Sequence, residues 1–174
     1  DTGSITPSSL QLADAMVEDM GLGEADTVVE LGPGTGVFTR VIQERLKPDA
    51  RFFCFEINRA LARSLSERFP RAEVVNDTVE NLSRHLKAAG RDLSDATISG
   101  LPWAAFTPER QELLLDATVE ALKPSGRFAT FAYSHAIWLP QARRFRERLE
   151  SRFGRVESSP VVWRNVPPEH RPPR

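Results

Sequence analysis

Residues 27–36 read Thr-Val-Val-Glu-Leu-Gly-Pro-Gly-Thr-Gly. The first half is a short apolar run with β-branched residues, which is typical of a buried strand. The second half places glycines at alternate positions, and glycine permits a tight turn and a close approach of a ligand to the backbone. The turn leads into the helical pattern of residues 37–46, and a helix N-terminus favours negative charge. This strand, turn and helix predict a ligand-binding unit of an α/β sheet.

The same alternation of strand and helix extends along the chain in both directions. Helical patterns separate the short apolar runs, so neighbouring strands are expected to pair in parallel through right-handed crossovers. We expect one doubly wound α/β domain over residues 1–174, with an N-terminal helix region at 1–22 and an irregular proline-rich tail at 165–174. The predicted strands cover residues 27–31, 51–57, 72–76, 95–100, 127–133 and 156–163, and the predicted helices cover 7–20, 37–46, 59–69, 78–89, 107–122 and 140–153.

The composition excludes several classes of protein. The chain has 23 basic against 24 acidic side chains and a mean hydropathy of −0.35, which is ordinary globular composition. No apolar run approaches the ~18 residues that a membrane-spanning helix needs. The single cysteine, Cys54, excludes an internal disulfide and a cysteine-rich zinc site, and it suits a reducing compartment. We therefore expect a cytoplasmic protein without a metal.

The spacing of the glycines separates two classes of ligand. A dinucleotide-binding turn carries glycines at i, i+2 and i+5, whereas Gly32, Gly34 and Gly36 stand at i, i+2 and i+4. Glu30 lies two residues ahead of the first glycine, and a carboxylate there suits a ligand that carries an amino group. The spacing argues against a dinucleotide, and a glycine-rich loop without any ligand is the alternative interpretation.

The segment from Glu30 to Gly36 resembles motif I of the class I S-adenosylmethionine-dependent methyltransferases. The resemblance implies that Glu30 and the three glycines hold the amino acid part of S-adenosylmethionine. It also implies that Glu56, at the end of the second predicted strand, accepts hydrogen bonds from both ribose hydroxyls, with Ile57 beside it in the cofactor site.

Two further positions belong to the cofactor site that this resemblance implies. Asp77 and Thr78 follow the third predicted strand, where the family carries an acid that accepts a hydrogen bond from the adenine amine. A helix N-cap is an equally good interpretation of Asp77. Ser99 ends the fourth predicted strand and completes the expected set of cofactor-binding residues.

Residues 99–103 read Ser-Gly-Leu-Pro-Trp. Methyltransferases that act on adenine or other planar nitrogens usually carry Asn or Asp before the proline dipeptide at this point, and here that side chain is missing. The departure counts against a nucleobase as the methyl acceptor.

Several segments together resemble the bacterial phospholipid N-methyltransferases, which are similar to the rRNA adenine dimethyltransferases. The resemblance covers nearly the whole chain, and it implies an amine acceptor such as a phosphatidylethanolamine-type head group. Compared with that branch, we expect the amphipathic N-terminal segment to be missing ahead of Asp1, and six strands in place of seven. The segments are residues 3–9, 30–39, 99–102, 131–133 and 164–168.

Aromatic residues near the ends of the fourth and fifth predicted strands are the candidate catalytic residues. Aromatic faces stabilise cations and would suit a sulfonium or a methylated ammonium. Trp103 and Tyr133 are the two that we assign to catalysis, with core or rim packing as the alternative for each. The sequence does not identify a catalytic base.

Residues 143–174 contain nine arginines against four acidic residues. The excess of positive charge could attract the protein to an anionic membrane surface, and a solvated helix face is the alternative that we favour. The near-neutral chain argues against nucleic acid as a partner. Methyl transfer to a soluble small molecule or to an rRNA adenine stays open, as does a cofactor-binding module without catalysis.

Overall fold

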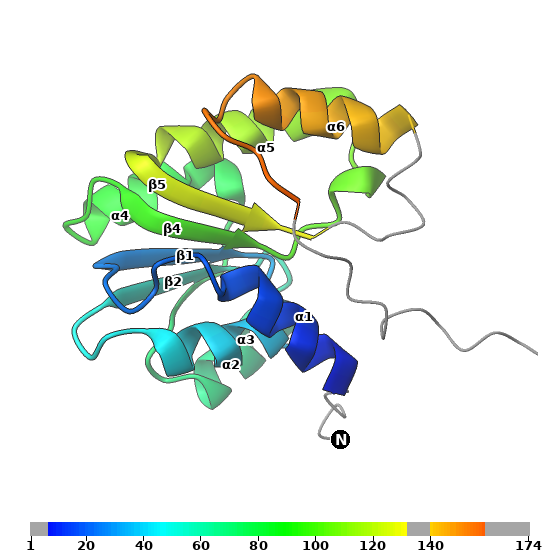
Figure 1. Cartoon of the computed structure of the whole chain (residues 1–174). Coiled ribbons are helices and arrows are strands. Elements are labelled where there is room, and N and C mark those ends of the chain that lie inside the picture. Colours follow the sequence, from blue (N-terminus) through cyan, green and yellow to red (C-terminus); the bar gives the residue numbers. More distant parts are fainter. Residues whose placement is uncertain (1–6, 132–139, 159–174) are drawn as a thin grey trace, which may run out of the picture.

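The computed structural model describes residues 7–131 and 140–158. In these residues five strands form one sheet in the order β3-β2-β1-β4-β5, and each neighbouring pair is parallel. This arrangement confirms the predicted doubly wound α/β fold (Figure 1). The strands are β1 Thr27–Leu31, β2 Arg51–Phe55, β3 Glu73–Val75, β4 Ser94–Ser99 and β5 Leu122–Thr130.

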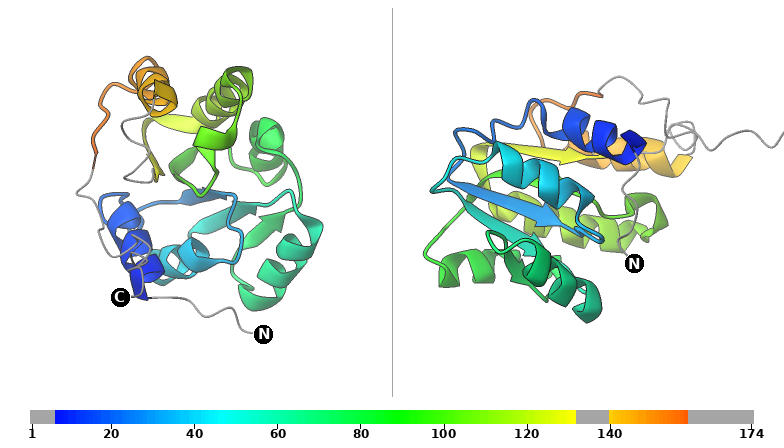
Figure 2. Two further views of the ribbon diagram at one scale, coloured as in Figure 1. Left: turned by 90° about the vertical axis from the view of Figure 1, so that its right-hand side faces the viewer. Right: turned by 90° about the horizontal axis from the view of Figure 1, so that it is seen from below.

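Helices cover both faces of the sheet, as Figure 1 shows for α1 to α3 below it and α5 and α6 above it, and Figure 2 shows from two further sides. All five residues of β1 are buried, because a central parallel strand meets helices on both faces. Val28 packs in the cluster that includes α1 and α2, and Val29 packs in the cluster that includes α4 and α5. The helices are α1 Pro7–Val17, α2 Val37–Arg45, α3 Arg59–Arg68, α4 Leu82–Ala88, α5 Pro108–Glu120 and α6 Pro140–Glu150, with short 3-10 helices η1 Val79–Asn81 and η2 Trp103–Ala105.

The chain reverses its direction of winding between β1 and β4, which are neighbours in the sheet. Ligands of open α/β sheets bind at the carboxyl ends of the strands beside such a reversal. Backbone pairing continues past the strands at this edge: the Gly32 N–H donates to the Phe55 carbonyl at 2.9 Å, and the Gly100 N–H donates to the Leu31 carbonyl at 2.8 Å. The loops after β1, β2 and β4 are thereby held together.

The observed fifth strand differs from the predicted one. It begins at Leu122, whereas the sequence predicts a helix up to residue 122, a break at 123–126 and a strand over 127–133. Ser94 of β4 pairs with Leu122, and the next paired residue of β4, Ala96, already faces Arg127, so the break is absorbed as an irregularity within the strand. This pairing across the sheet has no local sequence signal.

Two other expectations also meet a different outcome. The predicted helix 78–89 is divided into η1 and α4, and Asn81, the last residue of η1 and the N-cap of α4, has φ −93° and ψ 8°. Of the predicted strand 156–163, residues 156–158 are not in a strand and the remainder lies outside the described residues.

Candidate functional site

The site is built from the loops that follow β1, β2, β3 and β4, all at the carboxyl edge of the sheet. Figure 2 (left) looks onto this edge. The glycine loop, residues 32–36, follows β1 and runs directly into α2. Glu56 follows β2, Asp77 follows β3, and the β4 loop, residues 99–103, follows β4.

All three glycines of the glycine loop adopt positive φ, but a side chain would meet different surroundings at each of them. A Cβ on Gly36 would lie 2.5 Å from the Phe69 ring, and a Cβ on Gly32 would lie 2.8 Å from Leu101. Gly34 has φ +55°, and a Cβ there would meet nothing within 4 Å. Gly32 and Gly36 are therefore required by packing of the protein itself, whereas Gly34 borders open space.

The carboxylate of Glu56 lies against the glycine loop. It is 6% exposed. Its Oε2 accepts the Gly34 N–H at 3.1 Å and its Oε1 accepts the Asn58 N–H at 2.8 Å. The Asn76 side chain donates to the carbonyls of Glu56 and Ile57, at 2.8 and 3.0 Å, and so connects the ends of β2 and β3. A carboxylate has about four lone-pair sites, so Glu56 retains acceptor capacity.

Ile57 is a large apolar side chain in an unusual position. It is 72% exposed, immediately beside Glu56. Its apolar surface and the polar groups of Glu56 and Gly34 are therefore available side by side, as a ligand with an apolar ring and a polar sugar requires.

Glu30 lies beneath the glycine loop and is fully buried. Its Oε2 accepts the Thr39 hydroxyl at 2.7 Å, and the Cys54 thiol lies 3.5 Å away. Thr39 is in the first turn of α2, whose N-cap, Gly36, has no side chain to supply a cap. The Glu30 carboxyl contacts this first turn through the Thr39 hydroxyl. The contact of Glu30 with the amino group of a ligand, which its sequence position suggests, stays a prediction.

Burial raises the pKa of Glu30 to about 7, partly offset by the hydrogen bond from Thr39. Its Oε1 has no hydrogen-bond partner among the described residues. Because the pKa is higher in the folded than in the unfolded chain, the stability that this group contributes is fully present below about pH 4.5 and is lost as the pH rises through about 7.

We expect Glu30→Gln to flatten the dependence of stability on pH. The wild type should lose on the order of 2–3 kcal/mol, relative to this variant, between about pH 5 and pH 8. Urea unfolding across that range measures the difference, and Glu44→Gln, on the exposed surface of α2, is the control. Parallel curves for wild type and Glu30→Gln would show that the pKa of Glu30 is the same in the folded and the unfolded chain.

Asp77 is held by residues of the segment that follows it. Its Oδ1 accepts the Thr78 N–H at 2.8 Å and the Asn81 side chain at 3.0 Å, while its Oδ2 lies 2.7 Å from His85 Nε2 and 2.9 Å from Arg84. The bond with His85 is the main reason that the pKa of Asp77 lies well below its usual range. Thr78, not Asp77, is the N-cap residue of η1. Asp77 anchors side chains of the η1–α4 segment, and its contact with adenine stays a prediction.

Thr78 contributes its hydroxyl to a polar contact with Glu80, and Arg110 of α5 pairs with Glu80. The loop after β3 is thus tied to α5. Arg110 has no sequence signal for this role, because the contact depends on the packing of α5 against η1.

Ser99 and Trp103 organise the β4 loop. Ser99 is fully buried, and its hydroxyl accepts the Trp103 indole N–H at 3.0 Å. Trp103 is 3% exposed and stacks on Phe145 of α6 with 5.0 Å between ring centroids. This placement corrects the expectation that Trp103 offers a free aromatic face to a cation: it is a core residue, and the core-packing alternative describes it. Tyr133, the other catalytic candidate, lies outside the described residues.

This edge of the sheet fits the cofactor that the sequence resemblance implies. Gly34 leaves space where any larger residue would intrude, and Glu56 lies beside it with unused acceptor capacity. Ile57 adds an exposed apolar surface. Within residues 7–131 and 140–158, acidic, His and Cys side chains form no cluster of three or more that could hold a metal ion.

Comparison with known proteins places the chain among methyltransferases. Residues 8–82 match the family described as Ribosomal RNA adenine dimethylase. The ornithine lipid N-methyltransferase of Singulisphaera acidiphila is 36% identical over 145 residues, which cover 82% of this chain and 76% of that protein. The Ribosomal RNA small subunit methyltransferase A of Chlorobaculum tepidum is 30% identical over 60% of this chain and 38% of its own length. The chain therefore spans well under half of the ribosomal RNA relative.

Solved structures share the fold. The O-methyltransferase TomG of Streptomyces achromogenes, solved with S-adenosylmethionine, superposes with a TM-score of 0.62 at 19% identity, over 86% of this chain and 71% of that one. The 1,6-didemethyltoxoflavin-N1-methyltransferase of Burkholderia thailandensis, solved with S-adenosylhomocysteine, superposes with a TM-score of 0.53 at 20% identity, over 70% of this chain and 51% of that one. At these identities the likeness concerns the fold alone.

Proposed function

Because this chain belongs to the class I S-adenosylmethionine-dependent methyltransferases, we propose that it methylates an amine nitrogen of a lipid head group. The observation that carries the lipid assignment is the likeness to the ornithine lipid N-methyltransferase, which extends over 82% of the chain. The matches to ribosomal RNA methyltransferases are shorter in both proteins, and the β4 loop lacks the amide or acid side chain typical of adenine acceptors.

The proposed cofactor site uses backbone and side chains that are already in place. Gly34 lets the ligand lie against the glycine loop, where the N-terminus of α2 adds positive potential. Glu56 accepts the ribose hydroxyls, and Ile57 lies against the adenine ring. Glu30, Gly32 and Gly36 keep the loop in shape from below. Asp77, Thr78 and Ser99 shape the neighbouring loops, and the adenine contact of Asp77 stays a prediction.

When bound, S-adenosylmethionine supplies a methyl group that is already activated by a positive sulfur. The chain then has to place an unprotonated amine in line with that methyl group. An ammonium head group must first lose its proton, and desolvation lowers the pKa of an ammonium.

A transfer assay with radiolabelled S-adenosylmethionine tests the acceptor class. Separate reactions contain vesicles of ornithine lipid, vesicles of phosphatidylethanolamine, ribosomal RNA and polyamines. We expect label in the lipid fraction. Label only in RNA would establish the second candidate, an rRNA adenine methyltransferase, which the match of residues 8–82 favours. Label only in polyamines would establish a water-soluble acceptor.

Six of the nine arginines of the arginine-rich segment lie in residues 140–158, and Arg164, Arg171 and Arg174 lie outside the described residues. Arg146 and Arg155 pair with Glu150 and Glu157, while Arg148 and Arg152 pair with acidic residues of α5. Two other arginines of α6, residues 143 and 144, are exposed and form no ion pair within the described part of the chain. Figure 1 shows that α6 begins at the carboxyl edge of the sheet, and both arginines belong to the N-terminal half of this helix.

No helix in the described ranges combines the length and the hydrophobicity that crossing a bilayer requires. We expect a lipid acceptor to be met at the membrane interface through α6. We expect binding to anionic vesicles that weakens with salt. Each well-placed arginine adds about 1 kcal/mol, so replacing both Arg143 and Arg144 with Glu should weaken binding by about 30-fold or more. Vesicle sedimentation at low and high salt measures this.

The matched control is the double variant Arg71→Glu with Lys87→Glu. Both residues are exposed and both lie near the amino edge of the sheet, ahead of β3 and β4. This control variant changes the net charge by the same amount as the Arg143 and Arg144 double variant, and it should leave vesicle binding almost unchanged. Equal loss in the two double variants would mean that only the net charge matters.

A further inference from the structure

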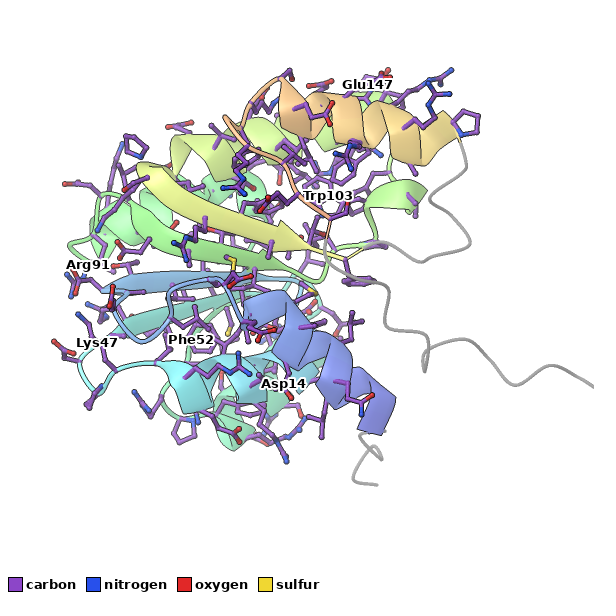
Figure 3. The ribbon with its side chains drawn as sticks, in the orientation of Figure 1. Asp14, Lys47, Phe52, Arg91, Trp103 and Glu147 are labelled. Atoms are coloured by element: carbon purple, nitrogen blue, oxygen red, sulfur yellow. The ribbon has the colours of Figure 1, made fainter. Side chains whose placement is uncertain are left out.

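The β4 loop is supported from behind by two helices. Phe145 of α6 stacks on one face of Trp103, and Figure 3 shows Trp103 between α6 and the sheet. Gln111 of α5 donates from Nε2 to the Trp103 main-chain carbonyl at 2.7 Å. The loop is therefore in contact with α6 through a ring and with α5 through an amide.

Gln111 is 3% exposed, and both ends of its amide are used. Its Oε1 accepts a hydrogen bond from Arg148 Nη1 of α6 at 3.0 Å. The orientation of the amide follows from chemistry, because a carbonyl can only accept and a guanidinium can only donate. A reversed amide would place like groups against each other at both ends. Arg148 thus selects the orientation in which Gln111 holds the carbonyl of Trp103.

Comparison with the neighbouring Arg152 isolates the contact between Arg148 and Gln111. Arg148 and Arg152 both have 18% exposed side chains, and both pair with Glu112 of α5. Arg152, just after α6, also pairs with Asp116, at 2.8 Å, and among the described residues it makes no hydrogen bond with Gln111. Both arginines therefore attach this part of the chain to α5, and of the two only Arg148 continues to the β4 loop.

We propose that Gln111 is a positioning residue for methyl transfer, which holds the β4 loop in place for the acceptor, and that Arg148 acts through Gln111. The proposal rests on the proposed function and deepens it, because it takes the β4 loop as the acceptor side of the site. It predicts that loosening the Trp103 carbonyl affects turnover without affecting the cofactor, whose expected ligands, such as Gly34 and Glu56, lie on other loops.

The variants are Gln111→Leu, Arg148→Met, the double variant of both, and Arg152→Met as the control. Turnover is measured with labelled S-adenosylmethionine and vesicles of ornithine lipid or phosphatidylethanolamine. Misplacement of a reacting group by about 1 Å costs up to about 100-fold in rate. We expect kcat to fall by about 10- to 100-fold in Gln111→Leu and Arg148→Met, with the KM for S-adenosylmethionine unchanged. Arg152→Met should lower thermal stability while kcat stays near that of the wild type.

The double variant tests whether Arg148 acts through Gln111. Contacts in one network are not additive. We therefore expect Gln111→Leu with Arg148→Met to have the kcat of Gln111→Leu alone. If kcat of the double variant instead falls by the product of the two single-variant losses, Arg148 does not act through Gln111. Equal losses of kcat in Arg148→Met and Arg152→Met would overturn the proposal. The losses would then result from weaker attachment of α6 to α5 and not from the contact with Gln111.

Amide hydrogen exchange of residues 99–106 gives a readout without turnover. Exchange should be about fivefold faster or more in Gln111→Leu and Arg148→Met, as expected for loss of one hydrogen bond, and unchanged in Arg152→Met. If the wild type methylates neither lipid, the proposed function fails while this measurement still decides whether the network holds the loop. Unchanged exchange in Gln111→Leu would overturn the positioning role.

Discussion

Gly34→Val should abolish measurable binding of S-adenosylhomocysteine while the fold is retained. Gly34 has φ +55° and open space where a side chain would point, so a branched side chain there would fill the volume proposed for the cofactor. The backbone itself would be strained, because a β-branched residue rarely adopts positive φ. Calorimetric titration measures the affinity, and thermal unfolding measures the cost to the fold.

Gly90→Val separates the two contributions. Gly90 has φ +73°, and a Cβ there would also meet nothing within 4 Å, but this glycine follows α4 at the opposite edge of the sheet. Both variants should lose similar stability, on the order of 1–2 kcal/mol. Only Gly34→Val should lose binding. Wild-type affinity in Gly34→Val would show that the cofactor does not approach this glycine.

Glu56→Ala should weaken binding of S-adenosylhomocysteine by about tenfold or more. A hydrogen bond to a charged group contributes about 1.5–3 kcal/mol, and every 1.4 kcal/mol is tenfold in affinity. The structure adds a second reason, because the same carboxylate accepts the Gly34 N–H at 3.1 Å. The variant would therefore lose the ribose contact and would loosen the glycine loop.

Glu56→Gln should fail to restore binding. Both carboxylate oxygens accept backbone N–H groups, from Gly34 and Asn58, so an amide would place its own NH₂ group against one of these donors. Glu67→Gln, on the exposed side of α3, is the control for the loss of one charge. Calorimetric affinities equal to the wild type in both Glu56 variants would remove Glu56 from the cofactor site.

The order of strands and helices is readable from the sequence because its signals are local. The apolar run of residues 27–31 and the glycine turn after it predict β1 and the start of α2 without reference to the rest of the chain. The caps at Asn58 and Thr107 likewise place the starts of α3 and α5, and both side chains accept backbone N–H groups as a cap requires. The start of β5 was not predictable, because it depends on pairing with Ser94 across the sheet.

Residues of the same type have different roles in this protein because their neighbours in the folded structure differ. Leu101 and Phe69 leave no room for a side chain at Gly32 and Gly36, whereas a side chain at Gly34 would meet open space. All three glycines nevertheless look alike in the sequence. Two arginines of α6 show the same effect, because Arg144 is exposed and Arg148 is held by Gln111 and Glu112. Helical periodicity could not separate them.

The sequence by itself was thus sufficient to predict the fold class, the glycine loop and the acidic residue after β2. Turns, caps and apolar periodicity involve residues only a few positions apart. The roles of Glu30 beneath α2 and of Trp103 in the core needed the folded molecule. Glu30 meets Cys54 across the sheet, and Trp103 meets Phe145 of α6. Such contacts join residues more than twenty positions apart, and they depend on how helices pack on the sheet, which no short stretch of sequence encodes.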